Sequence, residues 1–395
     1  MGRDQNSAKG TKSVCLVVTA EVTAVTFYKG YVRFLRDHGW TVSVIARSEG
    51  RLEEWAADEG AIAYSVDLAR EPSLFRDVKA LMQIIRILRR IRPDAVVSAT
   101  PKAGLIGTIA SRLASVPVRV YQIWGLRLET ERGMKRALLE TTERLAISSS
   151  TRCLANSESL ARVVRAAGLS HARAITVLGS GSSHGVDTEY FSRDLSPTAD
   201  AATLRFLATV PADVTVAFIG RLSRDKGIDT LLNSLDLCLA RGLCVRALIV
   251  GPAESWEAES IGHACADALH FVGGVEDVRP YIMAADILCL PTLREGFPNV
   301  VLEAASMQVP AIVSDATGSV DSVVPNITGL IFPVGDAGQL AQCLIRMAGD
   351  RDSLVRMGKA ARRHVLHDFQ QPDVWRLYES ELTEQIHVSH NRPHE

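Results

Sequence analysis

The stretch "VTVAFIGRLSRDKGIDTLLNSLDLCLARG", residues 214–242, decides how this chain folds. A run of β-branched and aromatic residues ends at Gly220, and after a short basic loop a helical pattern begins near Ile228. A strand that leads directly into a helix is the repeating unit of a parallel sheet. The stretch therefore predicts a polar loop at the carboxyl edge of a sheet, where ligands of such folds bind.

The same alternation of strands and helices runs along both halves of the chain, and a run rich in Ser, Pro, Ala and Asp, residues 192–213, interrupts it. Continuous apolar strands alternating with helices predict an α/β fold with two doubly wound, Rossmann-like parallel sheets facing each other across a cleft. We expect a first domain over 1–197, a linker over 198–212, a second domain over 213–370, and a C-terminal helix over 371–395 that returns to the first domain. The expected strands are 13–20, 41–47, 61–67, 94–100, 118–124, 151–157 and 174–181, then 214–220, 245–251, 270–274, 286–291 and 310–314.

The composition is that of a globular protein with a large core, since 47% of the 395 residues are hydrophobic and 23% are charged. The net charge of −1 is unevenly spread, because residues 1–193 hold 28 Lys and Arg against 19 Asp and Glu. A basic first half suits an anionic partner, such as a phosphate-bearing substrate or a membrane surface. Chance drift of surface charge would give the same imbalance. No nucleic-acid partner is expected.

The cysteines and the hydropathy pattern bear on location. The seven Cys are scattered without a CxxC pair, which predicts reduced residues of a cytosolic protein. The polar N-terminus predicts no signal peptide, and no apolar run approaches the roughly 20 residues of a membrane span. We therefore expect a cytoplasmic protein whose membrane contact, if it has one, is peripheral.

The basic loop after Gly220 carries Arg221, Arg224 and Lys226. Backbone N–H groups and cations between a strand and a helix suit a diphosphate. The loop is neither a Walker A loop nor a dinucleotide fingerprint, because it lacks both glycine patterns. Taken alone, a solvated basic turn would explain it equally well.

A second motif, "LREGFPNVVLEAAS" (293–306), places Glu295 and Glu303 eight residues apart around a Gly-Phe-Pro turn. Pro298 fits the first turn of a helix, and N–H groups at a helix start favour a phosphate. Glu303 would lie roughly 7.5 Å along that helix at 1.5 Å per residue. Because a carboxylate accepts two hydrogen bonds, one Glu can hold a ribose diol and the other a sugar diol. With the basic loop beside them, ordinary turn and surface roles explain the two residues less well.

Together with "GSGSSHGVDTEYF" (179–191), these motifs resemble the family 4 retaining glycosyltransferases of the GT-B fold. The stretch "SATPKAGLIGTIASRLASVPVRVYQIWGLRLE" (98–129) is similar to the bacterial branch that extends capsule, O-antigen or lipid-linked oligosaccharides with hexoses or N-acetylhexosamines. The resemblance covers about residues 13–386. It implies transfer from a nucleotide sugar, with UDP preferred, to a glycan or polyprenyl-diphosphate-linked acceptor, with retention of configuration. It implies no cofactor and no metal, because Arg and Lys supply the cations.

By the same resemblance, Arg221 and Lys226 bind the donor diphosphate, Glu303 the ribose and Glu295 the donor sugar. Glu295, Arg221 and Lys226 are the expected catalytic residues, acting by front-face displacement without a covalent carboxylate intermediate. The other expected donor-binding residues are Gly220, Gly251, Val275, Gly296, Phe297, Pro298, Asn299 and Val300. The expected acceptor-binding residues are Thr23, Lys102, Gly104 and Arg127.

The chain departs from the family pattern in its first domain. Relatives often have a His before the Gly at the position of Trp124, and His-x-His where this chain reads "VVSAT". Relatives often have Asn at the position of His184. The loop "TAEVTAVTF" (19–27) lacks the paired glycines common in GT-B enzymes, and its Thr hydroxyls are candidate acceptor contacts. No residue is assigned the role of the missing first-domain His.

Two other functions remain open from the sequence. A nucleotide-sugar 2-epimerase would bind the same ligand but would need no acceptor. A non-catalytic nucleotide-sugar-binding partner would explain the missing His but not the retained Glu295, Lys226 and Arg221. The basic amphipathic run 131–146 predicts a peripheral contact with an anionic membrane, with Met134, Leu138, Leu139, Leu145 and Ala146 on its apolar side and Arg132, Lys135, Arg136 and Arg144 on its basic side. A helix packed on its own domain would show the same pattern.

Overall fold

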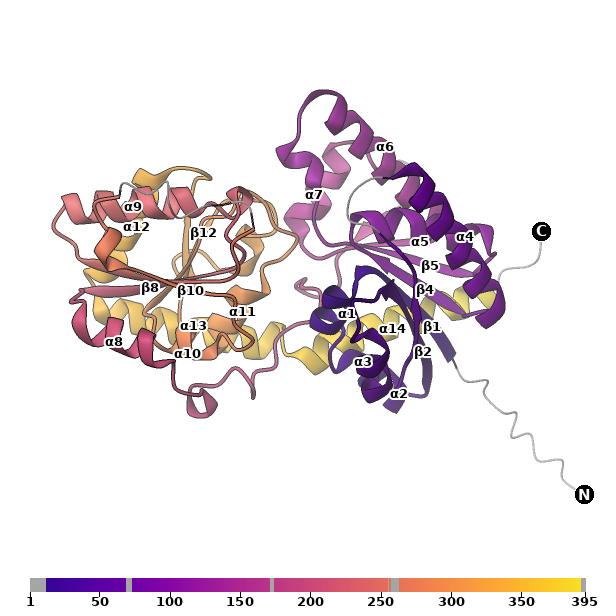
Figure 1. Ribbon diagram of the computed structural model, residues 1–395, viewed down its shortest axis with the longest axis horizontal. Coiled ribbons are helices and arrows are strands. Elements are labelled where there is room, and N and C mark those ends of the chain that lie inside the picture. Colours follow the sequence, from indigo (N-terminus) through magenta and orange to yellow (C-terminus); the bar gives the residue numbers. More distant parts are fainter. Residues whose placement is uncertain (1–11, 69–72, 171–173, 255, 257–262, 392–395) are drawn as a thin grey trace, which may run out of the picture.

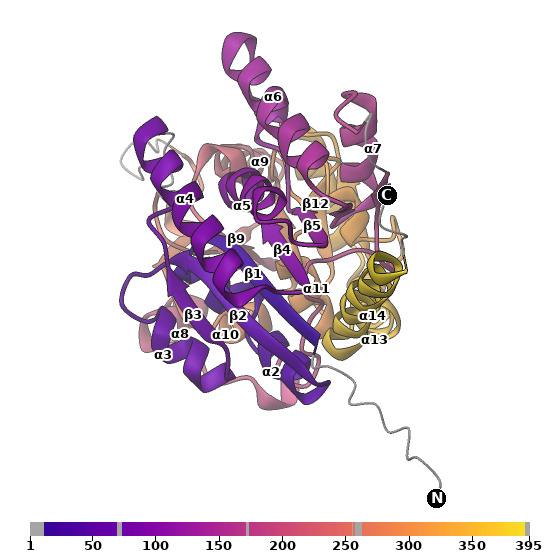
Figure 2. The same ribbon diagram turned by 90° about the vertical axis from the view of Figure 1, so that its right-hand side faces the viewer.

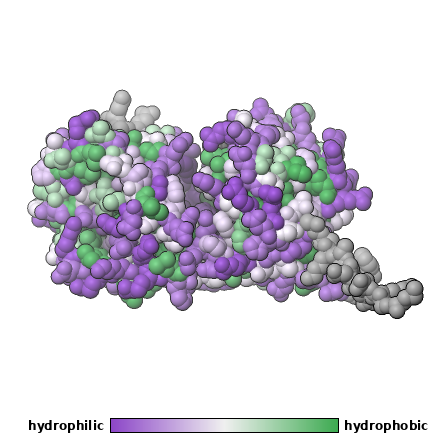
Figure 3. All heavy atoms as spheres, turned by 90° about the horizontal axis from the view of Figure 1, so that it is seen from below, coloured by the Kyte–Doolittle hydropathy of each residue, from purple (hydrophilic) through white to green (hydrophobic). Residues whose placement is uncertain are grey.

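The computed structural model describes residues 12–68, 73–170, 174–254, 256 and 263–391. Two lobes lie side by side, each built on one parallel sheet with helices packed against it (Figure 1). This confirms the predicted fold class. Seen from below, a hollow separates the two lobes along part of their boundary (Figure 3).

The first domain is a seven-stranded sheet in the order β3-β2-β1-β4-β5-β6-β7. Its central strand, β4, is buried along its whole length, as continuous apolar runs predict. The strands are β1 (Lys12–Ala20), β2 (Trp40–Arg47), β3 (Ile62–Ser65), β4 (Ala95–Ala99), β5 (Val118–Ile123), β6 (Arg152–Ala155) and β7 (Ile175–Thr176). The helices are α1 (Glu21–Phe27), α2 (Tyr31–Asp37), α3 (Leu52–Glu59), α4 (Leu74–Ile91), α5 (Pro101–Leu113), α6 (Gly133–Ser149) and α7 (Glu158–Ala166), with the 3₁₀ turn η1 (Arg127–Thr130) before α6.

The second domain is a six-stranded sheet in the order β10-β9-β8-β11-β12-β13. Its strands are β8 (Val214–Ile219), β9 (Val245–Val250), β10 (Leu269–Gly273), β11 (Ile287–Leu290), β12 (Ala311–Ser314) and β13 (Gly329–Phe332). Its helices are α8 (Ala201–Thr209), α9 (Ile228–Ala240), α10 (Arg279–Met283), α11 (Asn299–Ser306), α12 (Ala337–Ala348) and α13 (Arg351–Asp368). The 3₁₀ turns η3 (Arg224–Lys226) and η6 (Val320–Ser322) follow β8 and β12.

The last helix, α14 (Gln371–His390), crosses from the second lobe back to the first (yellow in Figures 1 and 2). Val374, Tyr378, Leu382 and Ile386 are buried in the core that covers one face of the first sheet. Their spacing of four residues gives the helix one apolar face, which the first domain buries. The chain therefore closes its first domain with its last helix.

The helical pattern "FYKGYVRFLRDHG" (27–39) predicts one helix that ends at Gly39, and the predicted start of this helix is wrong. The chain forms α1 where a loop was expected, and α2 begins only after Gly30. Gly30 has φ +76°, and a Cβ there would lie 2.8 Å from the Trp375 ring. The close approach of Trp375 thus favours glycine at this position, and the left-handed backbone of Gly30 separates α1 from α2.

The expected linker over 198–212 contains α8 and is not an irregular connection. Thr203 hydrogen-bonds His270 at 3.0 Å, and Tyr281 donates to Asp200 at 3.1 Å. These contacts fix α8 to the second domain. The stretch "IGHACADAL" (261–269) also has a helical pattern in the sequence. It lies partly outside the described residues, and its described part forms only a 3₁₀ turn, Ala266–Ala268.

Candidate functional site

At the carboxyl edge of the second sheet, the backbones of neighbouring strands pack closely against each other. Gly251 has φ +141°, and a Cβ there would collide with the carbonyl of Gly220. The ends of β8 and β9 can lie this close only because Gly251 has no side chain. A Cβ at Gly220 would meet open space, so this stretch of backbone is accessible to a ligand.

The basic loop after β8 contacts the loop that precedes α11. Lys226 forms an ion pair with Glu295, and their side chains are 19% and 15% exposed. The backbone N–H of Leu293 donates to the carbonyl of Asp225 at 2.8 Å, which joins the two loops. The two motifs that the sequence analysis treated separately thus form one polar site.

Two further charged pairs flank this site. Arg294 binds Asp225 at 3.2 Å, and Arg221 binds Glu254. Burial would raise the pKa of Asp225, but the Ser223 hydrogen bond and the neighbouring cations lower it below its usual value. The Arg221 side chain is 51% exposed, so its pair with Glu254 is weak and leaves Arg221 free to meet an anion.

Helix α11 begins beside these loops. Pro298 is its N-cap, one residue before the position that the sequence predicted, and Asn299 begins the helix. Phe297 is buried against Phe369, with ring centroids 5.4 Å apart, so its side chain serves the core. Val300 and Val275 are partly buried against the second-domain core. Phe297, Val300 and Val275 can therefore contact a donor only through their backbone or through the small exposed part of the side chain.

Glu303 lies inside α11 with no charged partner among the described residues. Burial raises the pKa of Glu303 to about 7. A partly exposed carboxyl with a perturbed pKa and no charged partner is a candidate ligand contact. Tyr190 is close enough that its pKa is raised in part by Glu303, and the Tyr190 ring stacks on Arg279 at 3.7 Å.

The first domain meets this site with aromatic side chains. Trp124 follows β5 and stacks on Phe27, with ring centroids 4.5 Å apart. The Phe27 ring contacts His184 edge-on at 5.2 Å, and His184 hydrogen-bonds Asn299 at 2.6 Å. Burial lowers the pKa of His184 to about 4, so this imidazole is neutral at pH 7. The sequence did not predict this cluster, because its members are far apart along the chain.

The backbones of the two domains touch beside Trp124. A Cβ at Gly296 would collide with the carbonyl of Trp124, and a Cβ at Gly125 would lie 3.4 Å from the Gly296 nitrogen. The loop that carries Glu295 therefore lies directly against the end of β5. Gly296, which the sequence analysis expected to bind the donor, thus contacts the first domain.

The four expected acceptor-binding residues differ in how exposed they are. Lys102 is largely buried and pairs with Asp77 at 2.7 Å. Gly104 is buried, and a Cβ there would collide with the Tyr121 ring, so this glycine allows α5 to pack on the sheet and does not face the cleft. Thr23 lies in α1 and is partly exposed, and Arg127 is exposed in η1.

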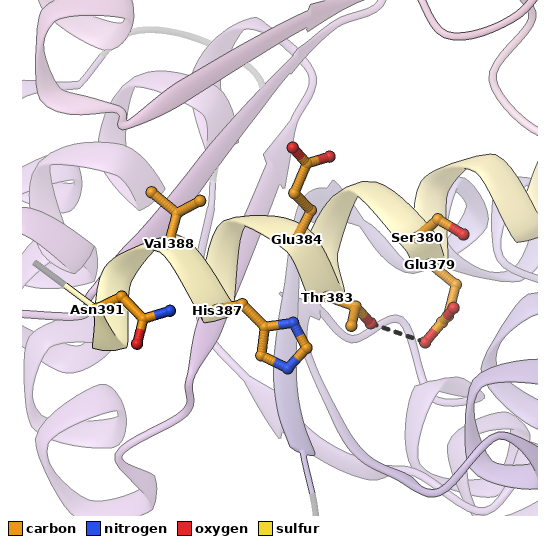
Figure 4. A pocket seen from close by; sticks show the side chains of 7 residues that line it. All are labelled: Glu379, Ser380, Thr383, Glu384, His387, Val388 and Asn391. Carbon is orange, nitrogen blue, oxygen red and sulfur yellow. Dashed lines mark hydrogen bonds between the residues drawn. The ribbon is translucent and has the colours of Figure 1, made fainter.

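An open groove of about 600 Å³ runs along α14, between Glu379 and Asn391 (Figure 4). All of its lining side chains come from this one helix. Glu379 is already bound by Lys12 at 2.8 Å. Because neither motif contributes to it, we do not assign the donor to this groove.

Known proteins resemble this chain over most of its length. The profile "Glycosyl transferase 4-like domain" matches residues 24–181, and "Glycosyl transferases group 1" matches residues 213–350. The capsular polysaccharide biosynthesis glycosyltransferase CapM of Staphylococcus aureus is 30% identical over 90% of this chain and 93% of its own. An Escherichia coli UDP-Gal:α-D-GlcNAc-diphosphoundecaprenol α-1,3-galactosyltransferase is 25% identical over 85% of this chain and 87% of its own. The crystal structure of Anabaena HepE in complex with UDP and glucose superposes with a TM-score of 0.75 and 18% identity, over 94% of this chain and 99% of HepE.

Two parallel-sheet domains that meet across a polar cleft define a protein of the GT-B class. Within that class, the chain belongs to the bacterial glycosyltransferase family that includes the capsular polysaccharide enzyme.

Proposed function

We propose that the protein is a retaining transferase that moves a hexose or N-acetylhexosamine from a UDP-sugar to a lipid-linked glycan in surface polysaccharide synthesis. The observation that carries the proposal is the Lys226–Glu295 pair beside α11, with the unpaired Glu303 on the same helix. The UDP and glucose bound to HepE, and the diphosphoundecaprenol acceptor of the Escherichia coli relative, support the choice of donor and acceptor.

The donor diphosphate binds between the basic loop and the start of α11. Lys226 leaves its ion pair with Glu295 to meet the phosphates, and Arg221 leaves its exposed pair with Glu254. The first N–H groups of α11 add partial positive charge. Preorganised positive charge stabilises the diphosphate as it leaves, which is the main demand of this reaction.

The two glutamates take separate parts of the donor. Glu303 accepts hydrogen bonds from the ribose hydroxyls, and Glu295 accepts them from the sugar. The bond between the anomeric carbon and the diphosphate oxygen breaks, and the acceptor oxygen bonds to the same face of that carbon. The acceptor proton passes to the leaving diphosphate, so no carboxylate nucleophile takes part.

We propose that this chemistry needs no metal. Lys226 and Arg221 supply the positive charge that a divalent ion supplies elsewhere. Activity that survives EDTA at full rate is the expected result.

We also propose that the first domain contacts an anionic membrane. Met134, Leu138 and Leu145 are exposed along one side of α6, and Met134 is 88% exposed. Leu139 is partly buried in the first-domain core and Ala146 is buried, so the expectation that they face the membrane is wrong. Among the described residues, no helix has the length and hydropathy to cross a bilayer.

Helix α4 adds a second exposed apolar stripe, formed by Phe75, Val78 and Met82. Arg76 and Lys79 are exposed beside it, as anionic lipids require. On α6, Lys135 pairs with Glu131 and Arg136 with Glu140, so the basic side of that helix is partly neutralised within the protein.

Flotation with anionic vesicles tests the membrane contact. Met134→Asp with Leu138→Asp should abolish binding, while Val355→Asp, at an exposed apolar position of the second domain, should not. If wild-type protein ignores anionic vesicles at low salt, the membrane proposal is wrong.

Incubation with a panel of nucleotide sugars, with and without a polyprenyl-diphosphate glycan, tests the proposed reaction. Mass spectrometry should show one added sugar on the acceptor, and NMR should show the donor's anomeric configuration retained. A free, altered sugar formed without acceptor would indicate an epimerase. Nucleotide-sugar binding without any product would indicate a non-catalytic partner.

A further inference from the structure

Residues 315–322, the first part of the connection between β12 and β13, contact the first domain, and we name this segment the clasp loop. Thr317 Oγ1 donates to Glu129 Oε2 at 2.5 Å, and the Gly318 N–H donates to Ser159 Oγ at 2.7 Å. The Ser159 N–H, in the first turn of α7, lies 3.3 Å from both carboxylate oxygens of Asp321. The clasp loop of the second domain is thus bound to the first domain at two places.

The same loop holds the backbone of Glu295. The Glu295 N–H donates to the carbonyl of Thr317 at 2.8 Å. Gly318 has φ +75°, and a Cβ there would lie 2.6 Å from the Glu295 carbonyl oxygen. Thr317 therefore binds the first domain through its hydroxyl, and through its carbonyl it binds the loop that carries Glu295, which we call the donor loop.

Glu129 is the first-domain end of this connection. Its Oε1 is buried and has no hydrogen-bond partner among the described residues. Burial raises the pKa of Glu129, and the Thr317 hydrogen bond and the charge of Arg294 only partly offset this rise. A half-satisfied buried carboxylate costs free energy, so Glu129 is an unfavourable choice for simple domain packing.

Arg294 provides a second route from Glu129 to the site. Its charge acts on Glu129, its Nε is buried without a partner among the described residues, and it binds Asp225, the neighbour of Lys226. One first-domain carboxylate is thus coupled to both members of the Lys226–Glu295 pair, through Thr317 on one side and Arg294 on the other.

We propose that Glu129 is a positioning residue that couples closure of the two domains to the placement of Glu295 and Lys226 through the clasp loop. The inference rests on the proposed function. When the domains part, the hydrogen bond between Thr317 and Glu129 breaks, and the clasp loop no longer fixes the backbone of Glu295. The site is therefore complete only in the closed form. Closure that completes a site is a general way to prevent reaction with water.

The test compares Glu129→Gln, Thr317→Val and the double variant, with Glu131→Gln as control. Glu131 lies two residues away and pairs only with Lys135 among the described residues. Each single variant should lower kcat by roughly tenfold or more, while the Kd for UDP stays within about twofold, because the ribose and diphosphate contacts lie in the second domain. Thr317→Ser, which keeps the hydroxyl, should restore kcat.

The double variant tests the coupling. Its kcat should be at most about twofold lower than that of the slower single variant. Effects that multiply, or an unchanged kcat in Glu129→Gln, would overturn the proposal. An equal loss in UDP affinity would do so as well, because it would indicate direct nucleotide contact.

Small-angle scattering of the unliganded protein separates this inference from the proposed function, because it requires no catalysis. Glu129→Gln and Thr317→Val should both increase the radius of gyration, and Glu131→Gln should not. If the wild type transfers no sugar but the two variants open, the proposed function fails and the coupling stands. If neither variant opens, the coupling is wrong whatever the enzyme transfers.

Discussion

The two walls of the cleft use polar side chains in opposite ways. In the second domain, Lys226, Glu295 and Glu303 lie at the cleft with partners that a ligand can replace, or with none. In the first domain, the Phe27–Trp124 stack lines the boundary, and Lys102 is bound to Asp77. We propose from this difference that the second-domain wall binds the charged donor and that the first-domain wall recognises the acceptor mainly by shape and apolar surface.

The largest effect is expected at the donor wall. Lys226→Ala should lower turnover by about 10²–10³-fold, the usual scale for losing one preorganised electrostatic stabiliser. The variant should stay folded, because Lys226 is partly exposed and its partner Glu295 can be solvated. Initial rates with saturating donor measure the effect, and Lys359→Ala, an exposed lysine of α13, is the control. Wild-type rates in Lys226→Ala would remove the basis of the proposed donor site.

A smaller effect separates the two glutamates. Glu303→Gln should weaken UDP binding by about 1.5–3 kcal/mol, or roughly ten- to a hundredfold in Kd, the scale of hydrogen bonds to a charged group. Glu295→Gln should leave UDP affinity within about twofold and lower the rate with the sugar nucleotide. Calorimetry with UDP and rates with the UDP-sugar measure both. The reverse pattern would exchange the two roles.

The raised pKa of Glu303 predicts a pH dependence. Below about pH 7 the buried carboxyl is protonated and accepts fewer hydrogen bonds, so UDP should bind more tightly as pH rises from 6 to 8. The unliganded protein should behave oppositely, because a raised carboxyl pKa means that stability is lost as pH rises through 7. Glu303→Gln should abolish both trends. A UDP affinity independent of pH in the wild type would contradict the placement of Glu303.

The smallest effect is expected at the acceptor wall. Lys102→Ala should change the KM for the lipid-linked acceptor by less than about threefold, because Lys102 is largely buried and its ammonium is already bound to Asp77 within the first domain. A tenfold rise in the acceptor KM, without loss of thermal stability, would show that Lys102 binds the acceptor after all.

Most of the fold was predictable from the sequence, since buried parallel strands are continuous apolar runs and the loops after them are polar. The errors came from contacts between distant segments. Nothing near Gly30 indicates that Trp375 packs against it, and the approach of that ring divides the expected helix. The Ser- and Pro-rich junction concealed α8, which is fixed by contacts to His270 and Tyr281.

The proposed donor site has a clearer sequence signal than the proposed acceptor site for a physical reason. A diphosphate favours cations and N–H groups where a loop leads into a helix, so each half of the proposed site is visible as a short motif: Lys226 in the loop before α9, and Glu295 with Glu303 around the start of α11. The acceptor wall is assembled from separate elements, and Gly104 shows that a motif glycine can serve packing alone. Glu129 was missed for the same reason, because its partner Thr317 lies in the other domain. The local sequence signal for Glu129 is that it is a carboxylate shortly after the end of β5.

A crystal structure of the protein soaked with UDP tests the account most directly. The account predicts the β-phosphate within about 3 Å of Lys226 Nζ, near the start of α11, and both ribose hydroxyls on the Glu303 carboxylate. UDP bound elsewhere, or bound in the cleft with Glu303 out of contact with the ribose, would contradict it.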